Sequence, residues 1–278
     1  MRTVRSKLRS VPVISVMLFA ICLPVPAQDE ETETVTSEDC QGCHDETPFG
    51  STYLENLQHS IHGDFECLDC HLDKDRVPHD ESSEFTTGCE GCRSCHTDVS
   101  EEYQAHGRAN IGECEDMPQC KDCHGDHNIL PSSVKQAPTH PTNLPTTCGK
   151  CHEDLNITRK YEILIDHPIE LYENSVHGKA TRGGIYVAAT CNDCHSTDGT
   201  AHKILSPGHP GSAINHFNIP KTCGKCHKGV ENDFWDGIHG KLVARGETDA
   251  PVCTHCHGEH GIISPDDPRS PVSRVRVA

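Results

Sequence analysis

The chain carries eight Cys-x-x-Cys-His motifs, in which two thiols and an imidazole recur at one short, fixed spacing. A random order of its 19 cysteines and 22 histidines would give about 0.1 such motifs. The spacing is typical of c-type haem attachment, in which the thiols bond to the porphyrin and the histidine binds the iron. The sequence therefore predicts eight covalent haem c groups. The attachment residues are Cys40, Cys43, Cys67, Cys70, Cys92, Cys95, Cys120, Cys123, Cys148, Cys151, Cys191, Cys194, Cys223, Cys226, Cys253 and Cys256. The proximal iron ligands are His44, His71, His96, His124, His152, His195, His227 and His257, and we number the motifs 1 to 8 in this order.

Each iron has a second axial position, and its ligand separates simple carriers from enzymes. Methionine is nearly excluded there, because only Met117 lies beyond the first 27 residues. Histidines outside the motifs are plentiful, and several recur in His-Gly pairs or shortly before or after a motif. Bis-histidine ligation at low potential is therefore predicted, with the individual pairings left open. The candidate distal ligands are His62, His79, His106, His127, His140, His177, His202, His216, His239 and His260, while His59, His167, His209 and His255 are weaker candidates.

The motifs belong to an internal repeat that has two motifs per unit. One copy begins at His106-Gly107 and the next at His177-Gly178, and both close on Thr-Cys-Gly-Lys-Cys-His. A third begins at His239-Gly240 but reads Ser270-Pro271-Val272 where the closing motif is expected, so it is either a natural half unit or part of a longer protein. The predicted organisation is a signal peptide at 1–27, an acidic lead-in at 28–39, a three-haem segment at 40–96, two-haem repeats at 97–152 and 153–227, and a half repeat with a tail at 228–278.

The elements that position these residues are expected to be short. Helices are predicted over 53–62, 169–177 and 230–239, each ending at a His-Gly pair whose glycine suits a helix end. Tyr172 and Phe234 each lie five residues before such a histidine and could pack either on a haem face or between helix and loop. Frequent proline and glycine elsewhere favour loops. The predicted fold is a multihaem cytochrome c, mostly loop with short α-helices wrapped around a haem core and with little or no β-sheet.

Composition agrees with a core made of cofactor. Only 34% of residues are hydrophobic and 4% are aromatic, which is too little for an ordinary core in a chain of 278 residues. About 31 mature residues would serve each haem, so the chain without haem should fail to fold. The formal charge of −18 argues against nucleic-acid partners and favours either basic redox partners or general solubility.

The N-terminus predicts export. Four basic residues precede an apolar run over 11–25, and Val25-Pro26-Ala27 offers a cleavage site. The run is short for a membrane span, and Ile21 is larger than the residue that usually precedes a lipidated cysteine, which argues against an anchor at Cys22. Two cysteines, Cys89 and Cys114, remain outside the motifs and could form a disulfide. Cys89 also has motif spacing with Cys92, but Arg93 follows and supplies no ligand.

These motifs, with Ser60-Ile61-His62-Gly63, Ser175-Val176-His177-Gly178 and the Thr-Cys-Gly-Lys-Cys-His blocks, resemble bacterial multihaem c-type cytochromes of the cytochrome c3-like, bis-histidine kind. The resemblance covers about residues 40–265. It implies electron transfer in the periplasm during anaerobic respiration, between a quinol-oxidising membrane cytochrome and a periplasmic or outer-membrane reductase. No membrane span is expected once the signal is removed.

Two other functions compete with an electron carrier. An octahaem oxidoreductase could act on nitrite, hydroxylamine or tetrathionate. The resemblance implies that several such enzymes mark the catalytic haem with a lysine in place of the motif histidine, whereas all eight motifs here end in histidine. A zinc or disulfide scaffold would also use Cys-x-x-Cys pairs, but it does not require eight trailing histidines. The carrier is the favoured interpretation.

Overall fold

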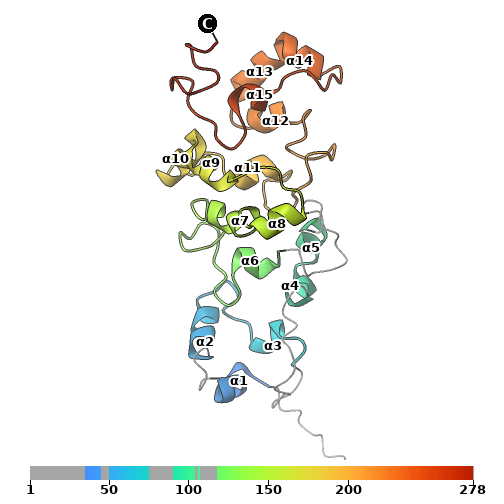
Figure 1. Cartoon of the computed structure of the whole chain (residues 1–278). Helices are drawn as coiled ribbons and strands as arrows, with labels where there is room; N and C mark the ends of the chain where they lie inside the picture. Colours follow the sequence, from blue (N-terminus) through green and yellow to red (C-terminus); the bar gives the residue numbers. More distant parts are fainter. Residues whose placement is uncertain (1–34, 45–49, 75–89, 104–105, 107–117, 278) are drawn as a thin grey trace, which may run out of the picture. The chain divides into compact units, whose positions relative to one another are not determined.

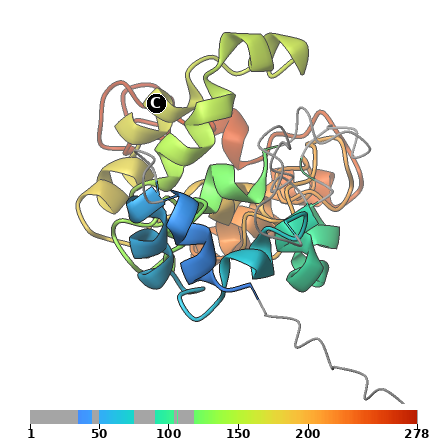
Figure 2. The same ribbon diagram turned by 90° about the horizontal axis from the view of Figure 1, so that it is seen from below.

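Short helices and connecting loops make up the chain in a computed structural model, which describes residues 35–44, 50–74, 90–103, 106 and 118–277 (Figure 1). Within these ranges no strand forms, and a single bridge joins Ser196 and Ile204. The view in Figure 2 likewise contains ribbon helices and loops only. The prediction of short helices with little or no sheet is confirmed. The helices are α1 (Ser37–His44), α2 (Gly50–Gln58), α3 (Cys67–Cys70), α4 (Glu90–Cys95), α5 (Thr97–Tyr103), α6 (Cys120–His124), α7 (Leu144–His152), α8 (Leu155–Lys160), α9 (Pro168–Asn174), α10 (Val176–Arg182), α11 (Cys191–His195), α12 (Ile219–Gly224), α13 (Lys228–Asp236), α14 (Ile238–Val243) and α15 (Cys253–His257).

The motifs fall into two alternating structural classes. Motifs 2, 4, 6 and 8 each begin a short helix at their first cysteine, in α3, α6, α11 and α15. Motifs 1, 3, 5 and 7 instead lie at or near the end of a helix that begins earlier, in α1, α4, α7 and α12. The structural repeat therefore contains one motif of each class.

An aspartate inside the motif explains why the even-numbered motifs start a helix. Asp69, Asp122 and Asp193 each stand directly before the second cysteine of motifs 2, 4 and 6. Each carboxylate accepts a hydrogen bond from the backbone N–H of the residue before the helix, at 2.9, 2.6 and 2.7 Å respectively. In motif 8 the Nδ1 of His255 accepts the equivalent bond from Val252 N–H at 3.2 Å. Each of these side-chain caps pairs the backbone N–H of the residue that precedes the helix and so fixes the helix start.

The predicted helices over 169–177 and 230–239 are each wrong in one respect, because each is broken before its histidine. Ser175 is extended between α9 and α10, and Gly237 is extended between α13 and α14. His177 and His239 consequently occupy the second position of a new helix rather than the end of the preceding one. The Ser175 hydroxyl caps α10 by accepting from Gly178 N–H at 3.0 Å.

The glycine after each histidine is therefore not a helix end but a point of close backbone approach. A side-chain carbon at Gly178 would overlap the carbonyl oxygen of Tyr172 and lie 2.8 Å from the Cα of Glu173. Gly240 meets Phe234 and Trp235 in the same way. Only glycine lets α10 and α14 lie this close to the end of the preceding helix.

Replacing Gly178 with alanine is expected to destabilise the haem-loaded protein by about 1–3 kcal/mol, the cost of forcing an extra carbon into packed backbone. Gly229→Ala is the matched control, since Gly229 lies in α13 with nothing within 4 Å of the added carbon. That control should leave stability unchanged or raise it slightly. Denaturant unfolding followed by circular dichroism measures both, and equal effects of the two substitutions would contradict the close-approach explanation.

Apolar packing contributes little to the described structure. The buried hydrophobic cluster contains Val243, Ala250 and Val252, with Phe234 and Trp235 among the partly buried residues against it. Many of the other fully buried side chains are serines and threonines. Even so, residues 35–278 form one unit by their contacts, with α7 packed against α8, α9 and α11. None of the helices in the described ranges is both long and apolar enough to cross a membrane.

Candidate haem-binding site

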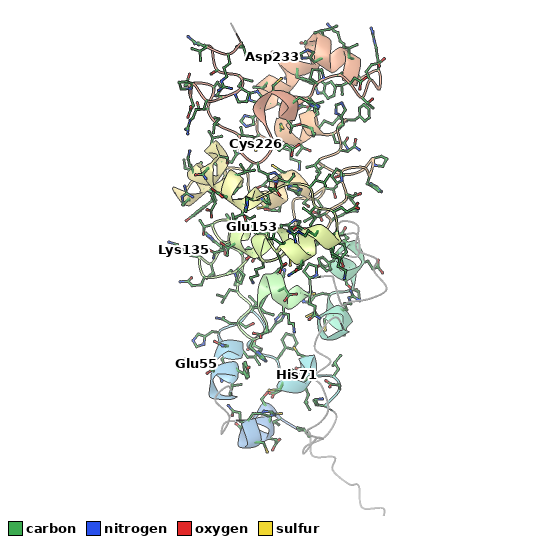
Figure 3. The ribbon with its side chains drawn as sticks, in the orientation of Figure 1. Glu55, His71, Lys135, Glu153, Cys226 and Asp233 are labelled. Atoms are coloured by element: carbon green, nitrogen blue, oxygen red, sulfur yellow. The ribbon has the colours of Figure 1, made fainter. Side chains whose placement is uncertain are left out.

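Six motif histidines each face a second histidine that lies outside the motifs. The ring centres of these pairs are 5.7–6.5 Å apart. Every second histidine is among the ten predicted distal candidates, and no motif histidine faces another motif histidine in these six pairs. Figure 3 labels one of the motif histidines, His71, just after α3. The pairs are His71 with His127, His96 with His62, His124 with His202, His152 with His106, His195 with His260 and His227 with His177.

The separation matches two imidazoles bound to opposite sides of one metal atom. A metal–imidazole bond is about 2 Å long and the ring nitrogen lies about 1.2 Å from the ring centre, which places the two centres about 6.3 Å apart. The observed distances of 6.0, 6.1 and 6.2 Å in three of the pairs are close to that value. The residues present therefore fit a haem iron with two axial histidines.

The pairing follows a regular register along the chain. The histidine of an even-numbered motif faces a histidine just after the next even-numbered motif. For example, His71 of motif 2 faces His127, which follows motif 4. The histidine of an odd-numbered motif faces the His-Gly histidine that precedes the motif before it; thus His227 of motif 7 faces His177, which precedes motif 6. The even-numbered pairs consequently join segments from different repeat units, whereas each odd-numbered pair joins the beginning and the end of one unit.

The two classes of pair also differ in ring orientation. The planes of the even-numbered pairs are nearly parallel, at 27°, 10° and 22°. Those of the odd-numbered pairs are crossed, at 66°, 55° and 50°. Two populations of bis-histidine iron would therefore exist within one chain.

Four distal candidates are not placed opposite a motif histidine. His79 lies outside the described residues, as do Cys89 and Cys114. His140 is buried against Tyr186 and its Nδ1 is 2.7 Å from the Thr142 hydroxyl, and His216 lies beside His255. His239 is exposed near the start of α14.

His140 and His216, both predicted as candidate distal ligands, do not occupy equivalent positions of the repeat. Asn143 N–H donates to the carbonyl of His140, and Asn218 N–H donates to that of Asn215, both at 2.8 Å. These matching turns place Asn215, not His216, at the position of His140. The spacing agrees, because His140 and Asn215 each lie eight residues before the first cysteine of the following motif, Cys148 and Cys223 respectively.

Burial lowers the pKa of several of the facing imidazoles, which favours the neutral form that binds metal. Burial, with the neighbouring His152, lowers the pKa of His106 to about 4. Burial, with the neighbouring His260, lowers the pKa of His195 to about 4. The Nδ1 atoms of His106 and His260 are also buried with no hydrogen-bond partner. Buried polar atoms are normally paired, so a bound group or water is expected beside each of these two nitrogens.

The motif cysteines connect each motif to the next. Each odd-numbered motif lies within hydrogen-bond distance of the next motif through the first cysteine of each. These pairs are Cys40–Cys67, Cys92–Cys120, Cys148–Cys191 and Cys223–Cys253. The second cysteines connect the intervening motifs, in the pairs Cys70–Cys95, Cys123–Cys151 and Cys194–Cys226. All sixteen of these cysteines are free thiols, so none of them forms a disulfide in the structure.

Two further contacts recur and hold the ligand-bearing segments in place. The Tyr172 hydroxyl donates to the carbonyl of Ala189, two residues before motif 6, at 3.0 Å, and the Tyr103 hydroxyl donates likewise to Pro118 before motif 4. Tyr172 therefore packs between helix and loop, the second of the two roles predicted for it. Lys150 and Lys225, within motifs 5 and 7, donate to the carbonyls of Asp122 and Asp193 at 3.0 and 3.2 Å.

A backbone bond joins the two kinds of distal histidine. Val176 N–H, one residue before His177, donates to the carbonyl of Ile262, two residues after His260, at 2.8 Å. Ile61 N–H donates in the same way to Ile129 at 2.9 Å, beside His62 and His127. The ligands of two successive motifs are thus fixed together.

Sequence reasoning missed the two motif classes, although the aspartate before the second cysteine in motifs 2, 4 and 6 is a readable signal. No family model, curated protein or solved structure matches the chain. No group of three or more His, Cys, Asp or Glu side chains that could hold a bare metal ion occurs among the described residues. The facing pairs are a different kind of site, because each offers two imidazoles and leaves the remaining iron positions to a porphyrin.

Proposed function

We propose that this protein carries electrons on eight covalently bound, mostly bis-histidine haem c groups. The observation that supports this most directly is the set of six facing histidine pairs, each joining one motif histidine to one histidine outside the motifs at an iron-spanning distance. An iron with both axial positions filled by protein has no site for substrate. Haem iron supplies one-electron redox chemistry between its ferric and ferrous states when it is bound.

The cysteine contacts support transfer from one haem to the next in sequence order. Each attachment site has a cysteine that lies near a cysteine of the next site. Porphyrins attached at successive sites would therefore be close neighbours. The chain's own residues contribute position and exclusion of water. The capped helices hold the attachment cysteines, and buried neutral imidazoles hold the two axial positions.

The surroundings proposed for this activity are the periplasm and an anaerobic respiratory chain. The apolar N-terminal run and the haem attachment motifs support export. The formal charge of −18 would favour basic faces on redox partners such as a quinol-oxidising membrane cytochrome or a terminal reductase.

Expression with haem-attachment machinery tests this function. Intact mass should show eight covalent haems, and EPR of the ferric protein should be dominated by low-spin signals. Two classes of low-spin signal are expected, because parallel and crossed imidazole planes split the iron orbitals differently. Addition of cyanide, nitrite or carbon monoxide should leave most of the spectrum unchanged. A protein with far fewer haems would contradict the proposal, whereas several ligand-binding haems with turnover of nitrite, hydroxylamine or tetrathionate would favour an oxidoreductase.

A further inference from the structure

The pairing register predicts a motif histidine opposite His239, and none of the eight motifs supplies it. His62, His106 and His177 each precede an even-numbered motif and face the odd-numbered motif that comes next, namely motifs 3, 5 and 7. His239 has the same place before motif 8. Its counterpart would be the histidine of a ninth motif.

The segment around His239 is built as in the unit before it. The α13–α14 pair repeats α9–α10, with an extended residue at the break and a glycine directly after the histidine. Gly240 approaches the backbone of Phe234 as Gly178 approaches Tyr172. Motif 8 contacts motif 7 through Cys253 and Cys223, as motif 6 contacts motif 5. His239 is therefore held by the same framework that holds His177.

What differs is the partner. His177 is partly buried opposite His227, whereas His239 is exposed and no histidine ring in the described ranges faces it. Val176 N–H and Ile61 N–H bond to the segment that carries the next distal histidine, but the structure records no such bond from Ile238 N–H to any residue that it describes. His257 of motif 8 likewise faces no histidine ring within the described part of the chain.

The tail repeats the turns that lead into motifs 5 and 7. Arg276 N–H donates to the carbonyl of Ser273 at 2.8 Å, as Asn218 N–H does to that of Asn215. The side chain of Arg276 reaches the carbonyl of Pro268 at 3.2 Å, and that of Asn218 reaches the carbonyl of Pro210 at 2.7 Å. This register places Val277 at the position of Ile219, the first residue of the helix that carries motif 7.

We propose that His239 is the distal ligand of a ninth haem c, whose Cys-x-x-Cys-His motif is not among the eight of this chain. The inference rests on the proposed electron-transfer function and extends it, because the ninth haem would continue the series past motif 8. The chemistry required is a ferric haem that already has one histidine bound and has water on its open face. The His239 nitrogen displaces that water and donates its lone pair to the iron. A motif on the same polypeptide and a motif on a second molecule would both present this group.

The first experiment compares His239→Ala with His177→Ala in the eight-haem protein. His177→Ala should convert one haem from low-spin to high-spin, as seen by EPR and by carbon monoxide binding to the reduced protein. His239→Ala should leave the spin states of all eight haems as they are in the unmodified chain. A new high-spin haem in His239→Ala would overturn the proposal, since His239 would then ligate one of the eight.

The second experiment supplies the missing haem. A soluble ferric haem c peptide with one Cys-x-x-Cys-His motif is titrated into the protein, and loss of its high-spin signal is recorded. His239→Ala should abolish the low-spin product, and His209→Ala, which removes another exposed histidine, should not. The same variants are sized over a range of protein concentrations without peptide. Association that depends on His239 and forms low-spin haem would show that His239 binds one of the eight haems of a second copy and would overturn the proposal, whereas peptide binding without association supports a ninth motif.

The proposal is also overturned if the titrated peptide gives no low-spin signal that depends on His239, or if His209→Ala loses the signal equally. Its failure is distinguishable from failure of the electron-transfer proposal. A haem count below eight, or no effect of His177→Ala, would contradict the electron-transfer proposal. A protein with eight haems in which His177→Ala frees one iron, but in which His239 does not bind the peptide, would contradict the ninth-haem proposal alone.

Discussion

The chain made without haem is expected to remain unfolded. Within the described ranges its buried hydrophobic residues are Ala137, Leu144, Ala213, Val243, Ala250 and Val252, of which three are alanines. Burial of a larger aliphatic side chain is worth about 1.5–3 kcal/mol, which cannot offset a backbone entropy cost of about 1–2 kcal/mol per residue over more than two hundred residues. Axial ligation of haem and packing around it would supply the difference, because these interactions form only in the folded state.

Production in the cytoplasm, away from the haem-attachment machinery, provides this apo-chain. Circular dichroism should show little helix, and limited proteolysis should degrade the chain far faster than the haem-loaded protein. The loaded protein produced from the same gene is the control. A compact, protease-resistant apo-chain would contradict the view that the cofactors form the core.

Removal of one distal histidine is expected to change one haem in eight. His260 faces His195 at 5.7 Å with nearly parallel rings, and its Nδ1 is buried without a hydrogen-bond partner. His260→Ala should therefore leave the iron held by His195 with one protein ligand. Its ferric form should become high-spin and bind cyanide, and its ferrous form should bind carbon monoxide.

His209→Ala is the matched control for His260→Ala, because His209 is exposed and faces no motif histidine in the described structure. Its spectrum should equal that of the unmodified protein. Covalent haem content should stay at eight in both variants, since the attachment cysteines are unchanged. If His260→Ala stayed fully low-spin, the pairing of His195 with His260 would be wrong.

The local chemistry of the chain is readable from sequence. Cysteines and histidines at a fixed spacing define the attachment sites, and the low hydrophobic content with frequent proline and glycine predicts short helices without a sheet. The aspartates at 69, 122 and 193 also mark the motifs that begin a helix, because a cap acts over only three residues. All six of the non-motif histidines that face a motif histidine came from the ten candidates predicted by recurrence.

Only the tertiary structure decides which histidines meet. His62 faces His96 across an intervening motif, and His124 faces His202 from 78 positions further along the chain. The breaks at Ser175 and Gly237 also escaped the sequence pattern. Local spacing determines the two cysteines and the histidine of each motif, which would bind the same haem because they are close in sequence. The second axial ligand depends on how distant segments of the chain pack, and that is set by backbone contacts such as Val176 with Ile262, which no short-range pattern records.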